Sequence, residues 1–177
     1  MLSWFRSQAQ DRRTAIDLYG ATVTQARRPP LFSAFGAADT AEGRTSVIIL
    51  HLYLMLDRLK RAETDASTLA RLLTETFITD IDDCLREMGV GDLTVPKKIK
   101  RVAQAMGERC IAYQRCLEAA PAGDALAAEL ALTIPGLEPA GDAARRLAQY
   151  VIRSREHLAA QPDSDVLNGR VTFLDAT

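Results

Sequence analysis

The chain has 177 residues, of which 47% are hydrophobic and 25% charged, as is usual for one globular domain. Its formal net charge of −1 excludes a global electrostatic attraction to nucleic acid or to an anionic membrane, so any such binding requires a local patch. The longest apolar run, residues 47–56, is far shorter than the ~20 residues that span a bilayer, and the first residues are too few for a secretion signal.

The cysteines also indicate the compartment. Cys84, Cys110 and Cys116 form no CxxC pair, and an odd count without metal-binding spacing indicates reduced thiols. We expect Cys84 and Cys110 to be small buried side chains. Together with the missing signal, this predicts a cytoplasmic protein.

Helical patterns dominate the first half of the chain. Residues 11–28 have apolar side chains at helical spacing, with Asp11 suited to the start, and end at two prolines. Residues 45–61 are apolar nearly all round, which predicts a central buried helix. Residues 66–88 are clearly amphipathic, and Gly89 suits the left-handed position that follows a helix.

Three further helices are expected. Thr94 suits an N-cap and Pro96 the first turn of a helix that reaches about Leu117. Residues 121–132 are rich in alanine and predict a short helix, and residues 142–160 form another amphipathic pattern. In the tail that follows, Val171 and Phe173 are expected either to pair briefly as a strand or to pack on the core.

These patterns predict an all-α fold: a single domain over residues 1–177, built as an irregular bundle of about six helices with a short non-helical C-terminal tail. Residues 1–10 are expected to be flexible. They contain Trp4 and Phe5, for which packing on the bundle is favoured over contact with a membrane surface or a partner.

Motifs of catalysis are missing from the sequence. It has no Gly-rich phosphate loop, no HExxH, no GxSxG and no Glu-x-x-His pair for a di-metal site. Of the two histidines, His51 lies in the most apolar helix and is expected to be a hydrogen-bonded core residue rather than a ligand. We therefore predict no catalytic residue, no metal site and no cofactor.

One carboxylate stands out. Asp80 falls on the apolar stripe of its helix, three residues after Phe77 and four before Cys84. A carboxylate in such a place needs a partner, and a structural ion pair is favoured over catalysis.

Four cations occupy a disfavoured place. Lys97, Lys98, Lys100 and Arg101 lie in the first turns of a helix, where the helix dipole opposes positive charge. Either they pair with Glu87, Asp92 or the Asp80–Asp83 cluster, or they form a patch facing phosphate, lipid headgroups, RNA or an acidic partner. No aromatic residue interleaves with them, which disfavours nucleic acid, and no DNA partner is expected.

Several stretches carry a family resemblance. The most specific is residues 81–100, IDDCLREMGVGDLTVPKKIK, and others are RPPLFSAFG (28–36), IILHLYLMLDRL (48–59), LAQYVIRSREHLAAQ (147–161) and LNGRVTF (167–173). They resemble the ubiquinol–cytochrome c chaperone family. One departure lies at residues 105–109, AMGER, where the family commonly has an aromatic-rich stretch similar to AFYGR.

The resemblance implies an all-helical, non-catalytic assembly factor for respiratory complex III that binds newly made cytochrome b. The chain is similar to the shorter bacterial members, because it has no mitochondrial-type presequence. Cytochrome b is the expected partner. An anionic lipid or membrane surface and the ribosome are the other partners considered, with the protein peripheral on the inner face of the cytoplasmic membrane.

We predict a partner-binding face where the specific motif and the disfavoured charges coincide. Its residues are Asp80, Arg86, Gly89, Asp92, Lys97, Lys98, Lys100 and Arg101. Two alternatives remain open. One is a lipid- or quinone-binding helical carrier, suggested by the apolar helix and the basic patch; the other is an enzyme that uses Asp80 with His51.

Overall fold

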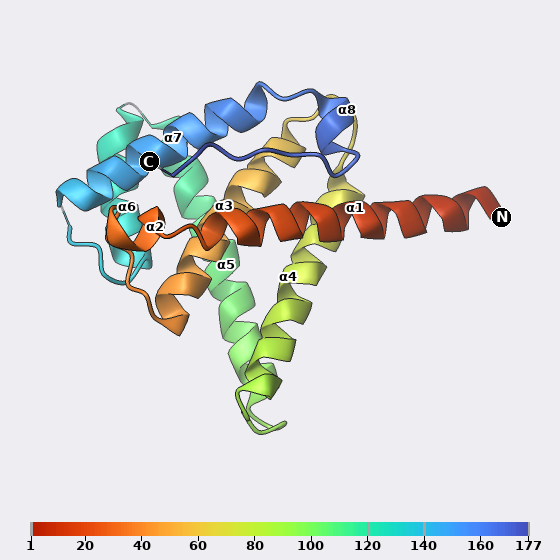
Figure 1. The fold of residues 1–177 in the computed structure, drawn as a ribbon, viewed down its shortest axis with the longest axis horizontal. Helices are drawn as coiled ribbons and strands as arrows, with labels where there is room; N and C mark the ends of the chain where they lie inside the picture. Colours follow the sequence, from red (N-terminus) through yellow and green to blue (C-terminus); the bar gives the residue numbers. More distant parts are fainter. Residues whose placement is uncertain (1, 120, 140, 177) are drawn as a thin grey trace.

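The computed structural model of the chain describes residues 2–119, 121–139 and 141–176, with side chains from Gln8 onward. These residues form eight helices and no strand, which confirms the all-α class (Figure 1). Six are the long helices expected from the sequence. The other two, α2 (Pro30–Ser33) and α8 (Asp163–Val166), have four residues each and were not predicted.

Helix α1 (Leu2–Ala26) begins well before Asp11, so the predicted start is wrong. An acidic residue favours a helix start but does not prevent earlier residues from being helical. The later turns of α1 bury Ala15, Leu18 and Tyr19 in the core as the pattern predicts, while its first turns project beyond the rest of the molecule (Figure 1). The side chains of Trp4 and Phe5 lie outside the described part, and the flexibility of residues 1–10 stays a prediction.

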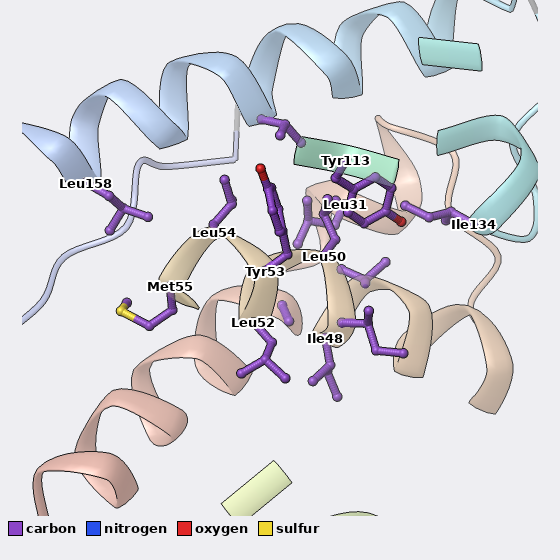
Figure 2. Close-up of a cluster of buried hydrophobic side chains, with 14 of the residues drawn as sticks. Leu31, Ile48, Leu50, Leu52, Tyr53, Leu54, Met55, Tyr113, Ile134 and Leu158 are labelled. Atoms are coloured by element: carbon purple, nitrogen blue, oxygen red, sulfur yellow. The ribbon is translucent and has the colours of Figure 1, made fainter. Parts of the chain in front are cut away.

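Helix α3 (Ala41–Lys60) is the central helix of the core. Thr40 caps its start, since its hydroxyl accepts a hydrogen bond of 3.1 Å from the backbone N–H of Gly43. Every residue from Val47 to Met55 is buried, with side chains leaving the helix in several directions (Figure 2). The helix contacts α1, α4, α5 and α7, which explains why its sequence is apolar on nearly all sides.

Helices α4 (Ser67–Glu87) and α5 (Val95–Glu118) form a hairpin whose turn projects at the bottom of Figure 1, away from α7. Gly89 has φ +74°, which confirms its expected left-handed conformation. Thr94 occupies the N-cap position of α5, as predicted, but its backbone is already helical and its side chain makes no capping bond. The backbone N–H of Thr94 is held by the carbonyl of Gly91 at 2.7 Å, so the turn itself starts the helix.

Helices α6 (Ala122–Thr133) and α7 (Asp142–Ala159) pack on each other, and the chain after α8 returns along α7 to the core (Figure 1). Val171 and Phe173 pack against the core, which is the second of the two arrangements expected for the tail. The side chain of Gln25 donates a hydrogen bond of 2.7 Å to the carbonyl of Leu174, fixing the tail to α1.

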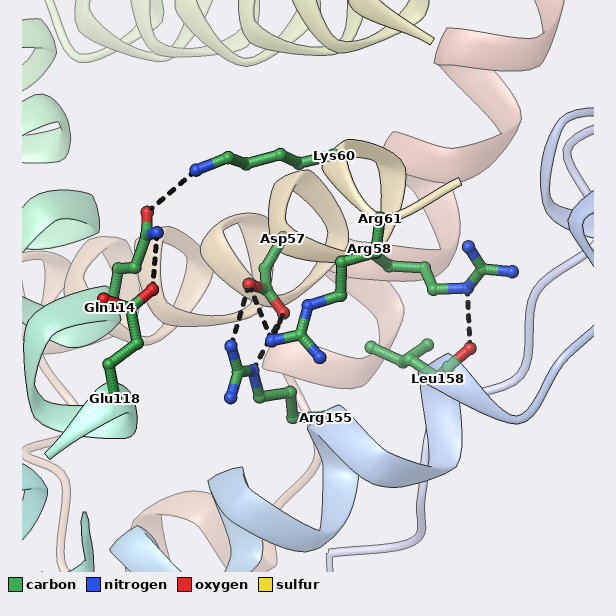
Figure 3. Close-up of polar contacts among 8 residues, drawn as sticks. All are labelled: Asp57, Arg58, Lys60, Arg61, Gln114, Glu118, Arg155 and Leu158. Carbon is green, nitrogen blue, oxygen red and sulfur yellow. Dashed lines mark hydrogen bonds and ion pairs between the residues drawn. The ribbon is translucent and has the colours of Figure 1, made fainter. Parts of the chain in front are cut away.

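A polar network joins α3 to α7 and α8. Asp57 and Arg58 end the apolar run in the sequence, yet both are buried. Arg155 of α7 donates to both carboxylate oxygens of Asp57, at 2.9 and 3.2 Å (Figure 3). The guanidinium of Arg58 donates to the carbonyl of Leu158 at 2.8 Å and to Asp163 of α8 at 2.5 Å, so each buried charge has an oppositely charged partner.

Across the described ranges, no helix combines the length and the apolar character that crossing a membrane requires.

Candidate interaction site at the α4–α5 hairpin

A groove of 360 Å³ lies between the start of α3, the second half of α4 and the first half of α5. Its walls are mostly apolar, with Ile49, Ile81, Leu85 and Val102 among them. Met88 stands at the groove with 68% of its surface exposed. Charged side chains join the apolar wall from two helices, namely Glu42, Arg101 and Arg109. This combination of apolar wall and polar rim is typical of a surface that binds a protein segment.

The groove exists because the apolar stripes of α4 and α5 are longer than the core they cover. Along α4, Leu73 and Phe77 are fully buried, Leu85 is half-buried and Met88 is exposed. Along α5, only Val95 and Tyr113 are buried, while the apolar residues between them stay partly exposed. No described element covers this remaining apolar area.

The structure divides the eight predicted residues into three sets, and Asp80 is in a set of its own. It faces the cleft between α1 and α4 rather than the groove, beside Tyr19 and Arg12. Its carboxylate accepts a hydrogen bond of 2.7 Å from the hydroxyl of Tyr19. Burial, together with this bond and the nearby charge of Asp80, raises the pKa of Tyr19 far above its usual value. The expected partner is therefore present, but it is a hydroxyl and not the cation of an ion pair.

Arg86, Gly89 and Asp92 shape the turn of the hairpin. Arg86 donates to Asp82 at 2.8 Å and to Asp92 at 2.7 Å, so one guanidinium links the last turn of α4 to the loop. Hydrogen bonding to Asp82 and the charge of both carboxylates raise the pKa of Arg86 above its usual value. These three residues hold the hairpin closed, and all three are exposed.

The four cations of α5 form the third set. Lys97, Lys98, Lys100 and Arg101 are all exposed, and none has a carboxylate within 4 Å among the described residues. None of the pairings expected with Glu87, Asp92 or the Asp80–Asp83 cluster is found among the described residues. Asp92 and Asp82 are both held by Arg86 instead. Only Arg101 also lines the groove.

Most residues of the groove were missed by the sequence analysis, including Ile81, Leu85, Met88, Val102 and Ala105. Their apolar periodicity was visible but was assigned wholly to the core. The available signal was the excess length of the two stripes, which continue to the very turn of the hairpin.

The prediction that Cys84 is a small buried side chain is wrong, because Cys84 is exposed on the wall of the groove. The second half of α4 extends past the core, so the residues on its apolar side lose their cover there. Partial burial, together with the carboxylate of Asp80, raises the pKa of this thiol, which favours its protonated form.

His51 is a hydrogen-bonded core histidine, as predicted. Its Nδ1 lies 2.8 Å from the carbonyl of Val47 and its Nε2 lies 2.9 Å from the hydroxyl of Tyr150. Burial lowers the pKa of the imidazole to about 4. Both nitrogens are thus occupied, and Asp80 bonds to Tyr19 instead, so the pair suggested for an enzyme does not form. The described residues also contain no cluster of three or more potential metal ligands.

Residues 105–109, where the sequence departs from the family pattern, lie beside the groove. Helix α5 runs through Gly107 without interruption, and a Cβ atom there would meet nothing within 4 Å. Ala105 and Arg109 line the groove, and Arg109 donates a hydrogen bond of 3.0 Å to the hydroxyl of Ser46. Met106 and Gly107, which stand where the family has its two aromatic residues, do not line the groove, and Met106 packs against the core.

Comparisons with known proteins identify a family and a similar solved structure. The family model described as Ubiquinol-cytochrome C chaperone matches residues 33–173, which include the whole hairpin. The chain is similar to the crystal structure of the Cbp3 homolog from Brucella abortus, with a TM-score of 0.85 and 31% sequence identity over 99% of this chain and 97% of that one. Among curated proteins, none matches the chain.

Proposed function

The chain belongs to the ubiquinol–cytochrome C chaperone family, and from this premise we propose that it is a non-catalytic assembly chaperone of ubiquinol–cytochrome c reductase that binds newly made cytochrome b. The observation that carries the proposal is the open apolar groove of the hairpin. Four of its lining residues, Ile81, Cys84, Leu85 and Met88, belong to the stretch 81–100 that carries the family resemblance.

The groove suits the physical task of such a chaperone. A client built of membrane-spanning segments exposes apolar side chains before its cofactors and partner subunits are in place. Holding such a segment reversibly requires a shallow apolar surface with a charged rim that gives orientation. The walls formed by Ile81, Leu85 and Val102, with Arg101 and Arg109 beside them, meet that requirement.

The predicted partner-binding face extends the proposed site beyond the groove. In this proposal Arg86, Gly89 and Asp92 fix the shape of the hairpin, and the cations of α5 contact anionic groups of a partner or a surface. Asp80 belongs to the neighbouring cleft and supports the α1–α4 contact through Tyr19.

The carrier alternative loses its main support. It was suggested by the very apolar stretch of α3, but those side chains are buried against the surrounding helices and form the core (Figure 2).

Deletion of the gene in its host tests the function. We expect selective loss of assembled complex III and of cytochrome b from the membranes, restored by the intact chain. Normal amounts of both in the deletion strain would refute the proposed client.

Filling the groove tests the site. Ala105→Trp places a large side chain in the groove and should abolish the rescue of complex III assembly. Ala128→Trp, on the exposed side of α6, is the control and should rescue fully. Both purified variants are compared with the parent chain by circular dichroism. A folded Ala105→Trp variant that rescues as well as the control would remove the groove from the function.

Charge reversal tests the basic patch. A variant with Lys97, Lys98 and Lys100 all changed to Glu should fold, because all three are exposed and unpaired among the described residues. It should fail to support complex III assembly. Full rescue by this variant would show that the patch has no part in the function.

A further inference from the structure

The turn of the α4–α5 hairpin lies at the outer edge of the molecule (Figure 1), and large apolar side chains are exposed there. Leu93 is 91% exposed and Met88 is 68% exposed. Packing in the core does not explain why these two residues are apolar, because the core lies at the other end of both helices. Exposed apolar side chains gathered at one place mark a surface that is covered by something else.

On the α5 side of this tip, the charged side chains are all positive. Residues 95–107 of α5 contain Lys97, Lys98, Lys100 and Arg101 and no carboxylate. All four are exposed and have no ion pair among the described residues. Positive charge in the first turns of a helix opposes the helix dipole, so the fold gains nothing from these residues.

No carboxylate of the hairpin, Glu87 included, pairs with these cations among the described residues. Asp80 and Asp83 face the cleft between α4 and α1. Asp82 and Asp92 are both held by Arg86. The basic side of the tip is therefore the α5 side, with Leu93 immediately before it.

We propose that the hairpin tip docks this protein on the surface of an anionic lipid bilayer. Met88 and Leu93 enter the interfacial layer, and Lys97, Lys98 and Lys100 contact the lipid phosphates. Apolar side chains beside a cluster of cations are the combination that binds anionic membrane surfaces without spanning them.

The shape of the tip favours lipid over an acidic protein. Leu93 lies in the turn at the projecting end of the hairpin (Figure 1), where a protein partner would need a matching cavity, whereas a fluid bilayer surface adapts to a projection. The choice also rests in part on the proposed function, because a client made of membrane segments is met at the bilayer.

Sedimentation of the full chain with lipid vesicles tests the proposal. One vesicle type is phosphatidylcholine alone and the other is phosphatidylcholine mixed with phosphatidylglycerol. We expect binding to the mixed vesicles and little to the neutral ones. Inorganic phosphate should compete no better than sodium chloride of equal ionic strength; stronger competition would indicate a site for free phosphate and overturn the lipid assignment.

Matched variants locate the contact. Leu93→Ser should reduce partitioning about tenfold, and the double variant Lys97→Glu/Lys98→Glu, which changes the charge by four units, should reduce it by more than tenfold. Leu132→Ser removes a leucine that is 77% exposed on α6, and Arg115→Glu/Arg153→Glu makes the same charge change at exposed sites elsewhere. Both controls should bind like the parent chain.

The outcomes separate this proposal from the proposed function. Vesicle binding is measured on the purified chain without client, so it does not depend on the identity of the client. If the parent chain does not bind mixed vesicles, or if tip variants and controls bind equally, the tip does not dock on lipid. If the parent chain binds no vesicles and the triple lysine variant still fails to support complex III assembly, the tip binds an acidic protein partner instead.

Discussion

His51 is held in one tautomer by its surroundings. The carbonyl of Val47 can only accept, so the proton lies on Nδ1. Nε2 then accepts from the hydroxyl of Tyr150, which in turn accepts a hydrogen bond of 2.8 Å from Gln25. The chain of bonds joins α3, α7 and α1 through groups that are all buried. The sequence predicted that His51 belongs to the core, but its partners come from helices far away in sequence.

This histidine should make stability depend on pH. Because its pKa in the fold is about 4 and that of an unfolded histidine is about 6.5, folding favours the neutral form. The contribution is complete above pH ~6.5 and is lost as the pH falls towards 4, by roughly 2–3 kcal/mol at pH ~4.5. Urea unfolding near pH 7.5 and pH 4.5 measures it.

The matched variant is His51→Gln, which keeps a polar side chain but does not titrate. It should be less stable than the parent at neutral pH and should show less loss of stability on acidification. An equal loss in both proteins would mean that other groups cause the acid sensitivity.

At the scale of the elements, two helices contain a glycine for opposite reasons. A Cβ at Gly43 in α3 would lie 1.9 Å from the carbonyl oxygen of Ala38, so only glycine permits that close approach. A Cβ at Gly107 in α5 would meet no atom within 4 Å. Gly107 therefore weakens its helix without providing a contact.

Replacing each glycine by alanine should shift stability in opposite directions. Gly107→Ala should raise the free energy of unfolding by ~0.5–1 kcal/mol, through helix propensity. Gly43→Ala should lower it by ~1–3 kcal/mol, because the backbone must move. Chemical denaturation of the two variants beside the parent gives both values, and destabilisation by Gly107→Ala would contradict the open surface described around it.

Helix periodicity was sufficient to predict the six long helices, but not every boundary. The helices of four residues were missed because a single turn has no apolar periodicity. Residue type indicated the N-cap position of Thr94 but not the missing capping bond, because the preceding turn already places its backbone in helical conformation. Cys84 was placed in the core because a helical stripe shows which side is apolar but not how far the core extends.

At the scale of the whole molecule, the C-terminal tail completes the core. Phe173 packs edge-on against His51 with ring centres 5.9 Å apart, and Ala176 is buried. The backbone N–H of Thr172 donates a hydrogen bond of 2.9 Å to the side chain of Gln161. The tail thus covers the site where α1, α3 and α7 meet, although it has no regular structure.

Removing residues 169–177 should therefore destabilise the entire fold. Loss of the apolar side chains of the tail, with the partner of Gln25, should cost at least ~2 kcal/mol in unfolding free energy. Asp175→Ala is the control, because its ion pair with Arg28 is largely exposed and should contribute less than ~0.5 kcal/mol. Thermal unfolding compares the three proteins, and equal midpoints would show that the tail is only an appendage.

The candidate site was predicted in part. The sequence directed attention to the hairpin, because the specific motif and the disfavoured charges coincide there. It did not show the groove, since the walls come from three helices whose crossing angles are set by packing. The sequence also grouped Asp80 with the cations, although Asp80 faces the cleft between α1 and α4 and the cations lie on α5.

Met88 belongs to two surfaces at once, since it borders the groove and forms part of the exposed tip. A segment bound in the groove that draws this flexible side chain inward removes apolar area from the tip. A bilayer that draws the side chain outward widens the opening of the groove. Binding at the two places is then thermodynamically linked. If the groove holds the client and the tip docks on a bilayer, as proposed, the factor by which the bilayer changes the affinity for the client equals the factor by which the client changes the affinity for the bilayer.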